Sequence, residues 1–300
     1  MKKTLAMLTG CALCVGMLAA CGGAPAAESA APSAAAVEST APASEAPKAE
    51  SLSGSVVTNG STSMEKVMGA LIEGFNAQYP DVDVTYDPTG SGSGIEAATN
   101  GSADIGLSSR ALKDEEKSTL TETVVAKDGI AIIVNPASKV EDLTVEQVTK
   151  IASGEIKDWS EVGGDAGAIA VVGREAGSGT RGAFEELTAT TGENGQPKVV
   201  YSQELTSTGA VVAAVASTPG AIGYASLSSV NDTVKAVKIA GVECTEKTVL
   251  DGSYTIQRPF VFATKTDGTL SEAAQAFFDF ATDAANAELY VAADVVPANG

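Results

Sequence analysis

One segment of this sequence, residues 173–181, combines the side chains that bind small anions. It reads Gly-Arg-Glu-Ala-Gly-Ser-Gly-Thr-Arg, follows an apolar run at 169–172 that predicts a buried strand, and precedes a helix predicted at 183–187. A glycine-rich turn from a strand into a helix exposes unpaired backbone N–H groups at the positive end of the helix dipole. Ser178 and Thr180 add hydroxyl groups, and Arg174 adds a charged, fork-shaped donor. The segment therefore predicts a site for an anion with several oxygen atoms.

Three classes of chemistry are disfavoured. The segment is no P-loop, because Ser178 stands where that motif has its second glycine and no lysine follows. A serine nucleophile needs a neighbouring base, usually histidine, and the chain has no histidine. Cys244 is the only cysteine after residue 21, which argues against a zinc cluster. We expect no enzyme, cofactor or metal; the structural alternative for 173–181 is an ordinary Gly-Ser surface turn.

Three further turns rich in glycine, serine and threonine follow predicted strands. They lie at 60–63, 90–94 and 108–110, after runs of strand character at 54–57, 82–86 and 103–107. The first turn precedes a helix whose apolar face is formed by Met64, Met68, Leu71, Ile72 and Phe75. Arg110, in the third turn, either faces the same ligand or pairs with one of the many acidic side chains.

Strands and helices alternate along the chain, which predicts an α/β fold with parallel strands. Further strands are expected at 129–135, 221–225 and 254–262, and helices at 143–151, 211–215, 271–281 and 284–291, with Thr144 as a helix cap. In such sheets ligands bind at the carboxyl ends of the strands. The four turns are therefore expected to converge on one ligand.

The first 51 residues are expected to lie outside this fold. Lys2 and Lys3, an apolar stretch and Leu18-Ala19-Ala20-Cys21 resemble the signal sequence and cleavage site of bacterial lipoproteins, which implies removal of residues 1–20 and acylation of Cys21. An uncleaved membrane anchor is the alternative, although the apolar stretch is short for a bilayer. Residues 22–50, rich in Ala, Ser, Pro and Glu, predict a flexible tether within 21–51.

The chain is strongly acidic, with 19 Lys and Arg against 38 Asp and Glu and a formal net charge of −19. This charge argues against nucleic acid or an anionic membrane surface as a partner. It does not exclude a small anion, because fields fade over about 8 Å at physiological salt. We therefore expect affinity to come from desolvated hydrogen bonds within a local site.

The sequence resembles a known family. The turns at 60–63, 90–94 and 173–181, with residues 103–106, 219–224 and 258–260, are similar to the phosphate-binding lipoproteins of bacterial high-affinity phosphate ABC importers. The resemblance runs from about residue 52 to the C-terminus. It implies a two-lobe, type II periplasmic-binding-protein-like α/β fold with the ligand in the cleft between the lobes. Lobe one would comprise 52–133 plus 255–300, and lobe two 134–254, with crossing strands near 132–135 and 254–257.

The resemblance also implies roles for individual residues. Candidate phosphate ligands come from all four turns and are Thr62, Ser63, Ser91, Ser109, Arg110, Arg174, Ser178, Gly179 and Thr180. The sequence departs from the pattern of some members at two positions: Ser109 stands where an aspartate accepts the proton of hydrogen phosphate, and Ala176 stands where an aspartate often braces the arginine. Glu175 or a backbone carbonyl could brace Arg174 instead.

The expected function is capture of inorganic phosphate and its delivery to an ABC importer, through permease and ATPase subunits. The protein would be a monomer, secreted and anchored by lipid to the outer face of the cell membrane. One alternative keeps the fold and changes the ligand to sulfate or an oxometallate, since the proton-reading aspartate is replaced. A secreted phosphatase-type enzyme and a structural surface lipoprotein are the others.

Overall fold

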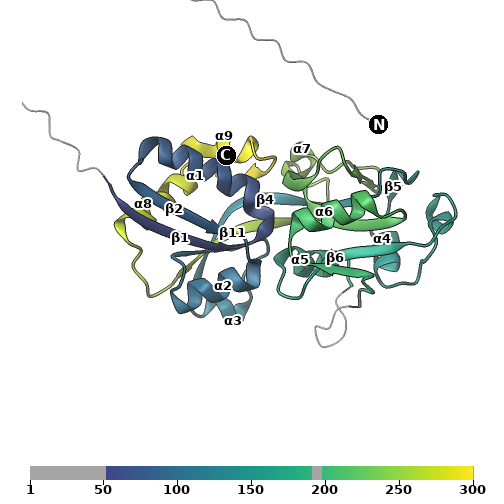
Figure 1. The fold of residues 1–300 in the computed structure, drawn as a ribbon, viewed down its shortest axis with the longest axis horizontal. Coiled ribbons are helices and arrows are strands. Elements are labelled where there is room, and N and C mark those ends of the chain that lie inside the picture. The colour runs from purple at the N-terminus through teal and green to yellow at the C-terminus, as the bar shows by residue number, and fades with distance from the viewer. Residues whose placement is uncertain (1–51, 191–197, 300) are drawn as a thin grey trace, which may run out of the picture. The chain divides into compact units, whose positions relative to one another are not determined.

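The structure of this protein is a computed structural model that describes residues 52–190 and 198–299. The predicted signal sequence, Cys21 and the tether lie outside the described residues. The described part is a mixed α/β fold around one ten-stranded sheet, with helices on both faces (Figure 1). The expected α/β class is confirmed.

The central sheet repeats one pattern twice, in the order β2-β1-β3-β11-β4-β8-β6-β7. In the first half β1 lies parallel to β2 and β3, and β11 runs antiparallel beside β3. In the second half β6 lies parallel to β7 and β8, and β4 runs antiparallel beside β8. The strands are β1 Gly54–Gly60, β2 Val82–Asp87, β3 Ile105–Ser108, β4 Leu120–Val134, β6 Ala170–Arg174, β7 Gln203–Leu205, β8 Ala221–Ser226 and β11 Gln257–Lys265. The short strands are β5 Asp142–Leu143, β9 Lys235–Ala236, β10 Lys238–Ile239 and β12 Val296–Pro297.

The helices repeat in the same way. In the first half α1 and α2 follow β1 and β2, and in the second half α5 and α6 follow β6 and β7. The α-helices are α1 Glu65–Gln78, α2 Ser91–Asn100, α3 Asp114–Lys117, α4 Val145–Ala152, α5 Gly179–Leu187, α6 Thr208–Ser217, α7 Glu246–Leu250, α8 Glu272–Thr282 and α9 Ala287–Val291. Single 3₁₀ turns are η1 Thr62–Met64, η2 Trp159–Val162, η4 Leu227–Ser229 and η5 Ala284–Asn286. The expected cap at Thr144 is confirmed, because its hydroxyl accepts from Gln147 N at 3.1 Å.

Strand β4 belongs to both halves. It pairs with β11 as far as Gly129 and with β8 from Ile130 onward, and Ile130 N donates to Ile256 O at 2.8 Å. The sequence predicts only the apolar end of β4, because residues 120–128 mix polar and apolar side chains without a clear period. The change of partner thus lies a few residues before the crossing expected at 132–135.

Two helices begin inside segments that the sequence predicts as turns. Helix α2 begins at Ser91, within the turn predicted at 90–94, and α5 begins at Gly179 rather than at the predicted position near Ala183. The glycines that mark a loop in the sequence are packing residues here. A Cβ on Gly94 would lie 2.4 Å from Asn59 O, so only glycine lets α2 approach β1 this closely.

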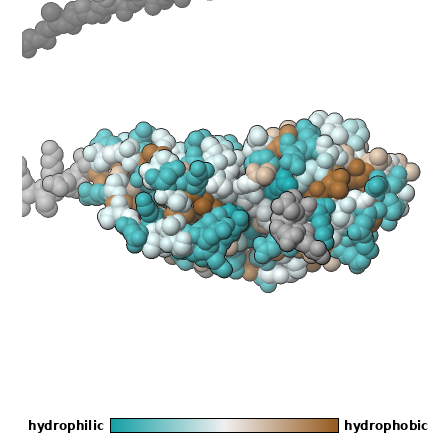
Figure 2. All heavy atoms as spheres, turned by 90° about the horizontal axis from the view of Figure 1, so that it is seen from below, coloured by the Kyte–Doolittle hydropathy of each residue, from teal (hydrophilic) through white to brown (hydrophobic). Residues whose placement is uncertain are grey.

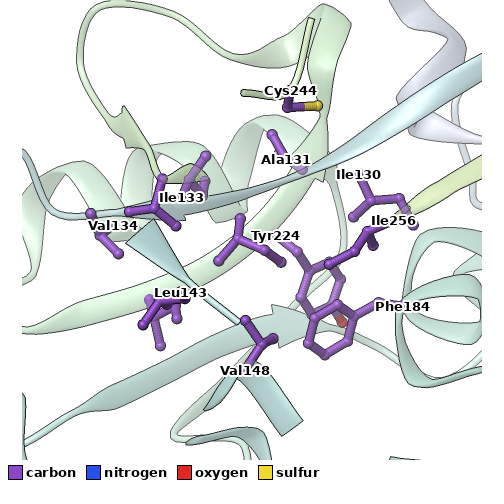
Figure 3. Close-up of a cluster of buried hydrophobic side chains, with 14 of the residues drawn as sticks. Ile130, Ala131, Ile133, Val134, Leu143, Val148, Phe184, Tyr224, Cys244 and Ile256 are labelled. Carbon is purple, nitrogen blue, oxygen red and sulfur yellow. The ribbon is translucent and has the colours of Figure 1, made fainter. Parts of the chain in front are cut away.

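Separate apolar cores hold the two halves. In the first half Phe260 and Phe262 of β11 pack with α1 and α8 on one face, and Val261 and Ala263 pack with Ile95 of α2 on the other. In the second half one cluster gathers α4, α5 and α6 against β4 and β8. There the rings of Phe184 and Tyr224 stack with centroids 4.1 Å apart, as Figure 3 shows.

The surface agrees with the acidic composition. Hydrophilic and intermediate residues cover most of the face in Figure 2, and hydrophobic residues appear there in small separate patches. In the described ranges, no helix combines the length and the apolar character that crossing a membrane requires.

Candidate functional site

Four helix N-termini carry the residues of the candidate site. Thr62 and Ser63 lie in η1 ahead of α1, Ser91 is the first residue of α2, Gly179 and Thr180 begin α5, and Thr208 begins α6. Each helix follows a parallel strand of its half, so the carboxyl ends of β1, β2, β6 and β7 present these N-termini. Unpaired N–H groups and the positive ends of the helix dipoles accompany the side chains.

Side chains from both halves form one hydroxyl cluster, which we define as Thr62, Ser63, Thr180 and Thr208. Thr62 Oγ1 lies 3.0 Å from Thr208 Oγ1, and Ser63 Oγ lies 2.8 Å from Thr180 Oγ1 and 3.1 Å from Thr208 Oγ1. All four residues are at most 4% exposed. Since a hydroxyl can donate or accept, the cluster can donate to an unprotonated oxygen of a bound anion or accept from a protonated one.

A second pair of hydroxyls lies beside the cluster. Ser91 Oγ is 3.2 Å from Ser109 Oγ and accepts from Ser109 N at 3.1 Å. Gly179 packs against both, because a Cβ there would lie 2.3 Å from Ser91 Oγ and 2.9 Å from Ser109 Oγ. Gly92 N of α2 also donates to Gly177 O across the halves at 2.9 Å. The backbone of α5 therefore approaches the first half more closely than any side chain would allow.

Arg174 provides the positive charge of the site and is 2% exposed. Its Nε and Nη2 donate to the two carboxylate oxygens of Glu175 at 3.0 and 2.8 Å, and to the carbonyls of Leu205 and Thr206 at 3.1 Å each. Its Nη1 donates to Thr62 Oγ1 at 2.9 Å and Thr208 Oγ1 at 3.2 Å. Both braces considered from the sequence, Glu175 and backbone carbonyls, are thus present.

Aromatic and charged side chains bind the backbone of Arg174. Arg174 N donates to the Tyr224 hydroxyl at 3.1 Å, and Arg181 Nη1 donates to Arg174 O at 2.9 Å. Arg181 is itself paired with Glu185 at 2.8 Å. Burial, above all, raises the pKa of Tyr224 to about 12, so its hydroxyl stays neutral at physiological pH. These contacts fix the backbone of the turn at 173–181.

Three of these four helix starts, those of α2, α5 and α6, have no acidic residue in the first turn. Helices α3, α4, α7, α8 and α9 each have at least one there, where a carboxylate is stabilised by the dipole. Helix α1 carries Glu65, one turn behind Thr62 and exposed. The dipoles at the cluster are thus left for a ligand.

The structure brings together seven of the nine candidate ligands from the sequence: Thr62, Ser63, Ser91, Ser109, Arg174, Gly179 and Thr180. The Ser178 hydroxyl instead caps α5, where it accepts from Arg181 N at 3.3 Å. The Arg110 guanidinium is not brought to the cluster: it donates to both oxygens of Glu116, at 2.8 and 2.7 Å. Of the two roles considered for Arg110, the structure shows the pairing with an acidic side chain.

Thr208 is the site residue that the sequence reading missed. It follows β7 within Thr206-Ser207-Thr208-Gly209, a fifth turn of the same composition, and Ser207 caps α6 by accepting from Ala210 N at 3.1 Å. Strand β7 spans only three residues and has no apolar run, so no strand was expected ahead of this turn. In the described ranges no group of three or more His, Cys, Asp or Glu side chains could hold a metal ion.

Comparison with known proteins identifies the class. A family model described as the PBP superfamily domain matches residues 30–285. The chain is similar to the X-ray structure of a candidate phosphate ABC transporter substrate-binding protein with bound phosphate from Clostridium perfringens, with 38% identity, a TM-score of 0.76 and coverage of 81% of this chain and 99% of that one. An ABC-type phosphate transport receptor from Vibrio cholerae matches with 34% identity, a TM-score of 0.67 and coverage of 80% and 99%. The chain is a periplasmic-binding-protein-like protein.

The curated relatives narrow this class. The phosphate-binding protein PstS of Bacillus subtilis (strain 168) is 34% identical over 211 residues, which cover 69% of each chain. The PstS of Borreliella burgdorferi is 29% identical over 242 residues, covering 78% of this chain and 86% of that one. This chain belongs to the PstS family, as its resemblance at residues 60–63, 90–94 and 173–181 implied.

Proposed function

We propose that this protein captures inorganic phosphate and delivers it to an ABC importer. The observation that carries the proposal is Arg174: a buried guanidinium, braced on Glu175 and two carbonyls, whose Nη1 reaches hydroxyls from both halves. A tetrahedral oxyanion at the cluster would accept from Arg174, from the hydroxyls and from N–H groups of the four helix N-termini. A similar protein solved with bound phosphate, from Clostridium perfringens, supports this choice of ligand.

We assign the binding residues on this basis. Arg174, Ser91, Ser109 and the hydroxyl cluster would donate from their side chains, and Gly179 from its backbone. Ser178 would act by capping α5, and Arg110 would lie outside the contact set, because Glu116 occupies its guanidinium. The relatives are binding proteins by name, which supports a protein without catalytic activity. Turnover of a phosphate ester by the purified chain would contradict that part.

Binding would close two lobes by a hinge motion. We propose lobes of 52–133 plus 255–300 and of 134–254, with the hinge in the crossing strands. The exchange of partners in β4 between Gly129 and Ile130, and the contact of Ile130 with Ile256, support crossings close to these limits. Hydroxyl contacts between Thr62 and Thr208 are then contacts between lobes.

The cellular setting is also part of the proposal. We infer a secreted monomer, acylated at Cys21 after removal of residues 1–20 and held at the outer face of the cell membrane by the tether. The partners would be the permease and ATPase subunits of the importer. Labelling with a radioactive fatty acid tests the anchor: label should enter the wild-type chain and be lost from Cys21→Ser, and label retained in that variant would contradict it.

The ligand is tested by calorimetric titration of the full chain, purified in detergent and stripped of endogenous ligand, with phosphate and then sulfate. Tight phosphate binding without sulfate heat is expected. Equal binding of both would favour the second candidate, a general oxyanion receptor, which the presence of Ser109 in place of an aspartate makes worth testing. No binding of either by the folded chain would contradict the transport assignment.

A further inference from the structure

A buried ion pair joins the two strands that connect the halves. Asp128 of β4 lies directly opposite Arg258 of β11 in the antiparallel register. Their side chains are 0% and 1% exposed, and Arg258 Nε and Nη2 donate to Asp128 Oδ2 at 3.0 and 2.9 Å. The pair lies where the two halves of the sheet meet, since β4 exchanges partners after Gly129.

The ion pair leaves one strong donor unused. Nη1 of Arg258 is buried and has no hydrogen-bond partner among the described residues. Asp128 offers it no acceptor in this arrangement, because Oδ2 serves the other two nitrogens and Oδ1 accepts from Ser226 Oγ at 2.7 Å. A buried N–H of a charged group without an acceptor is costly and rare in folded proteins. Another acceptor is therefore expected beside Arg258.

The neighbours of the pair lead to the hydroxyl cluster. Ser226 Oγ lies 2.8 Å from Ser228 Oγ, and Ser228 Oγ donates to the backbone carbonyl of Ser63 at 3.4 Å. Ser226 ends β8 and Ser228 follows it. Strand β8 occupies in the second half the position that β3, followed by Ser109, occupies in the first. The carboxyl end of β8 therefore lies beside the candidate site, as the carboxyl end of β3 does in the first half.

The positive charge of Arg174 also acts on Arg258. Burial lowers the pKa of Arg258, and the nearby positive charge of Arg174 lowers it further. Arg174 binds Glu175 through Nε and Nη2, and Arg258 binds Asp128 through the same two nitrogens. In both arginines Nη1 makes no bond to that carboxylate. Two buried cations that repel each other are stabilised by an anion that both can contact.

We propose that Arg258 is a further ligand-binding residue, whose Nη1 donates to an oxygen of the bound anion while Asp128 fixes the guanidinium. The inference rests on the proposed function and deepens it. With two guanidiniums, and with Ser109 where some family members have an aspartate, the site suits a doubly charged tetrahedral oxyanion, such as the dianion of hydrogen phosphate.

The test compares three variants of the full chain by calorimetric titration with phosphate. Asp128→Asn/Arg258→Met replaces the pair by neutral side chains of similar size, which a fold tolerates better than a single unpaired charge. Its phosphate affinity should fall about 10- to 100-fold, the range expected for one lost hydrogen bond to a charged group. Asp128→Asn keeps the Arg258 donor but loosens its guanidinium, so it should weaken phosphate binding less than the double variant does, and it should lower the Tm.

Each outcome decides the proposal. Wild-type affinity in the folded double variant overturns it, and so does an equal loss in Asp128→Asn, because the pair would then only position other residues. If circular dichroism shows the double variant unfolded, Arg258→Lys keeps the charge beside Asp128 and should still bind about tenfold more weakly. Wild-type affinity in Arg258→Lys overturns the proposal. A wild-type chain that binds neither phosphate nor sulfate contradicts the proposed function, and this inference with it.

Discussion

The two halves of the sheet share one topology and differ in the chemistry they bring to the candidate site. Each has a central strand with parallel neighbours, and each sends two helix N-termini to the site. The first half contributes the neutral hydroxyls of Thr62, Ser63, Ser91 and Ser109. The second contributes hydroxyls too, and with them the buried charge of Arg174.

This difference between the halves explains how an acidic protein can bind an anion. The charge of Arg174 lies in the second half, where Glu175, two carbonyls and the Tyr224 hydroxyl fix it. The other half adds hydroxyls and dipoles that cost little to bury, because each hydroxyl already has a partner. We therefore expect variants of Arg174 to affect affinity through charge, and variants of the first-half hydroxyls to affect it through fit.

The largest effect is expected from Arg174→Met. Removing this guanidinium leaves Glu175 without its partner and the anion without its charged donor, so the binding free energy should weaken by about 3–5 kcal/mol, as when a buried pair is broken. Phosphate titration measures this, with circular dichroism as the check on folding. Arg110→Met is the matched control, since that guanidinium is paired with Glu116 away from the cluster, and it should change affinity by less than about 1 kcal/mol. Equal effects of the two variants would refute the division between the halves.

Gly94→Ala should give the next largest effect, on stability rather than on affinity. A Cβ there would lie 2.4 Å from Asn59 O and 2.6 Å from Gly60 Cα, both backbone atoms, so α2 must move away from β1. We expect a loss of about 1–3 kcal/mol in the free energy of unfolding, the usual range for overpacking. The control in the other half is Gly209→Ala in α6, which meets nothing within 4 Å and should be neutral or slightly stabilising. Urea denaturation of both variants decides the matter, and equal stability would contradict the close approach of α2.

Gly179→Ala should act on the contact between the halves. The added Cβ would lie 2.3 Å from Ser91 Oγ and 2.9 Å from Ser109 Oγ, whereas on Gly182 of the same helix it would find ordinary space 3.6 Å from Arg110 Cδ. Phosphate affinity should weaken by about 1–3 kcal/mol in Gly179→Ala. Gly182→Ala should stay close to wild type in the same titration. If both bind normally, the hydroxyls of the first half are not held against α5 when the ligand is bound.

The fold and most of the site could be predicted because their signals are local. The alternation of apolar runs with Gly/Ser/Thr turns predicted the α/β class and the convergence of the turns, and the family resemblance carried by three of those turns named Thr62, Ser63, Ser91, Thr180 and Arg174. Signals that depend on tertiary packing were lost. The polar half of β4 acquires strand character only from its pairing with β11, and Arg110 is decided by Glu116, six residues away along the chain.

Thr208 was missed for a reason that the comparison of the halves makes plain. Its strand, β7, is short and polar, so the turn after it carried no strand signal. The repeated topology would have found it: α6 follows β7 as α2 follows β2, and Thr208 begins α6 as Ser91 begins α2. The second copy of a repeat can therefore reveal a site residue where local patterns are weak.

The correspondence between Thr208 and Ser91 predicts similar contributions of their hydroxyls to phosphate binding. Thr208→Val and Ser91→Ala each remove one buried hydroxyl at a corresponding helix start, so each should weaken phosphate binding by about 0.5–1.5 kcal/mol. Thr208→Val should fall at the upper end, because Thr208 Oγ1 also accepts from Arg174 Nη1 at 3.2 Å. Thr85→Val is the control, since that exposed hydroxyl of β2 only donates to Val56 O at 3.2 Å. If Thr208→Val binds like this control while Ser91→Ala is impaired, the halves share a topology without sharing the task of holding the anion.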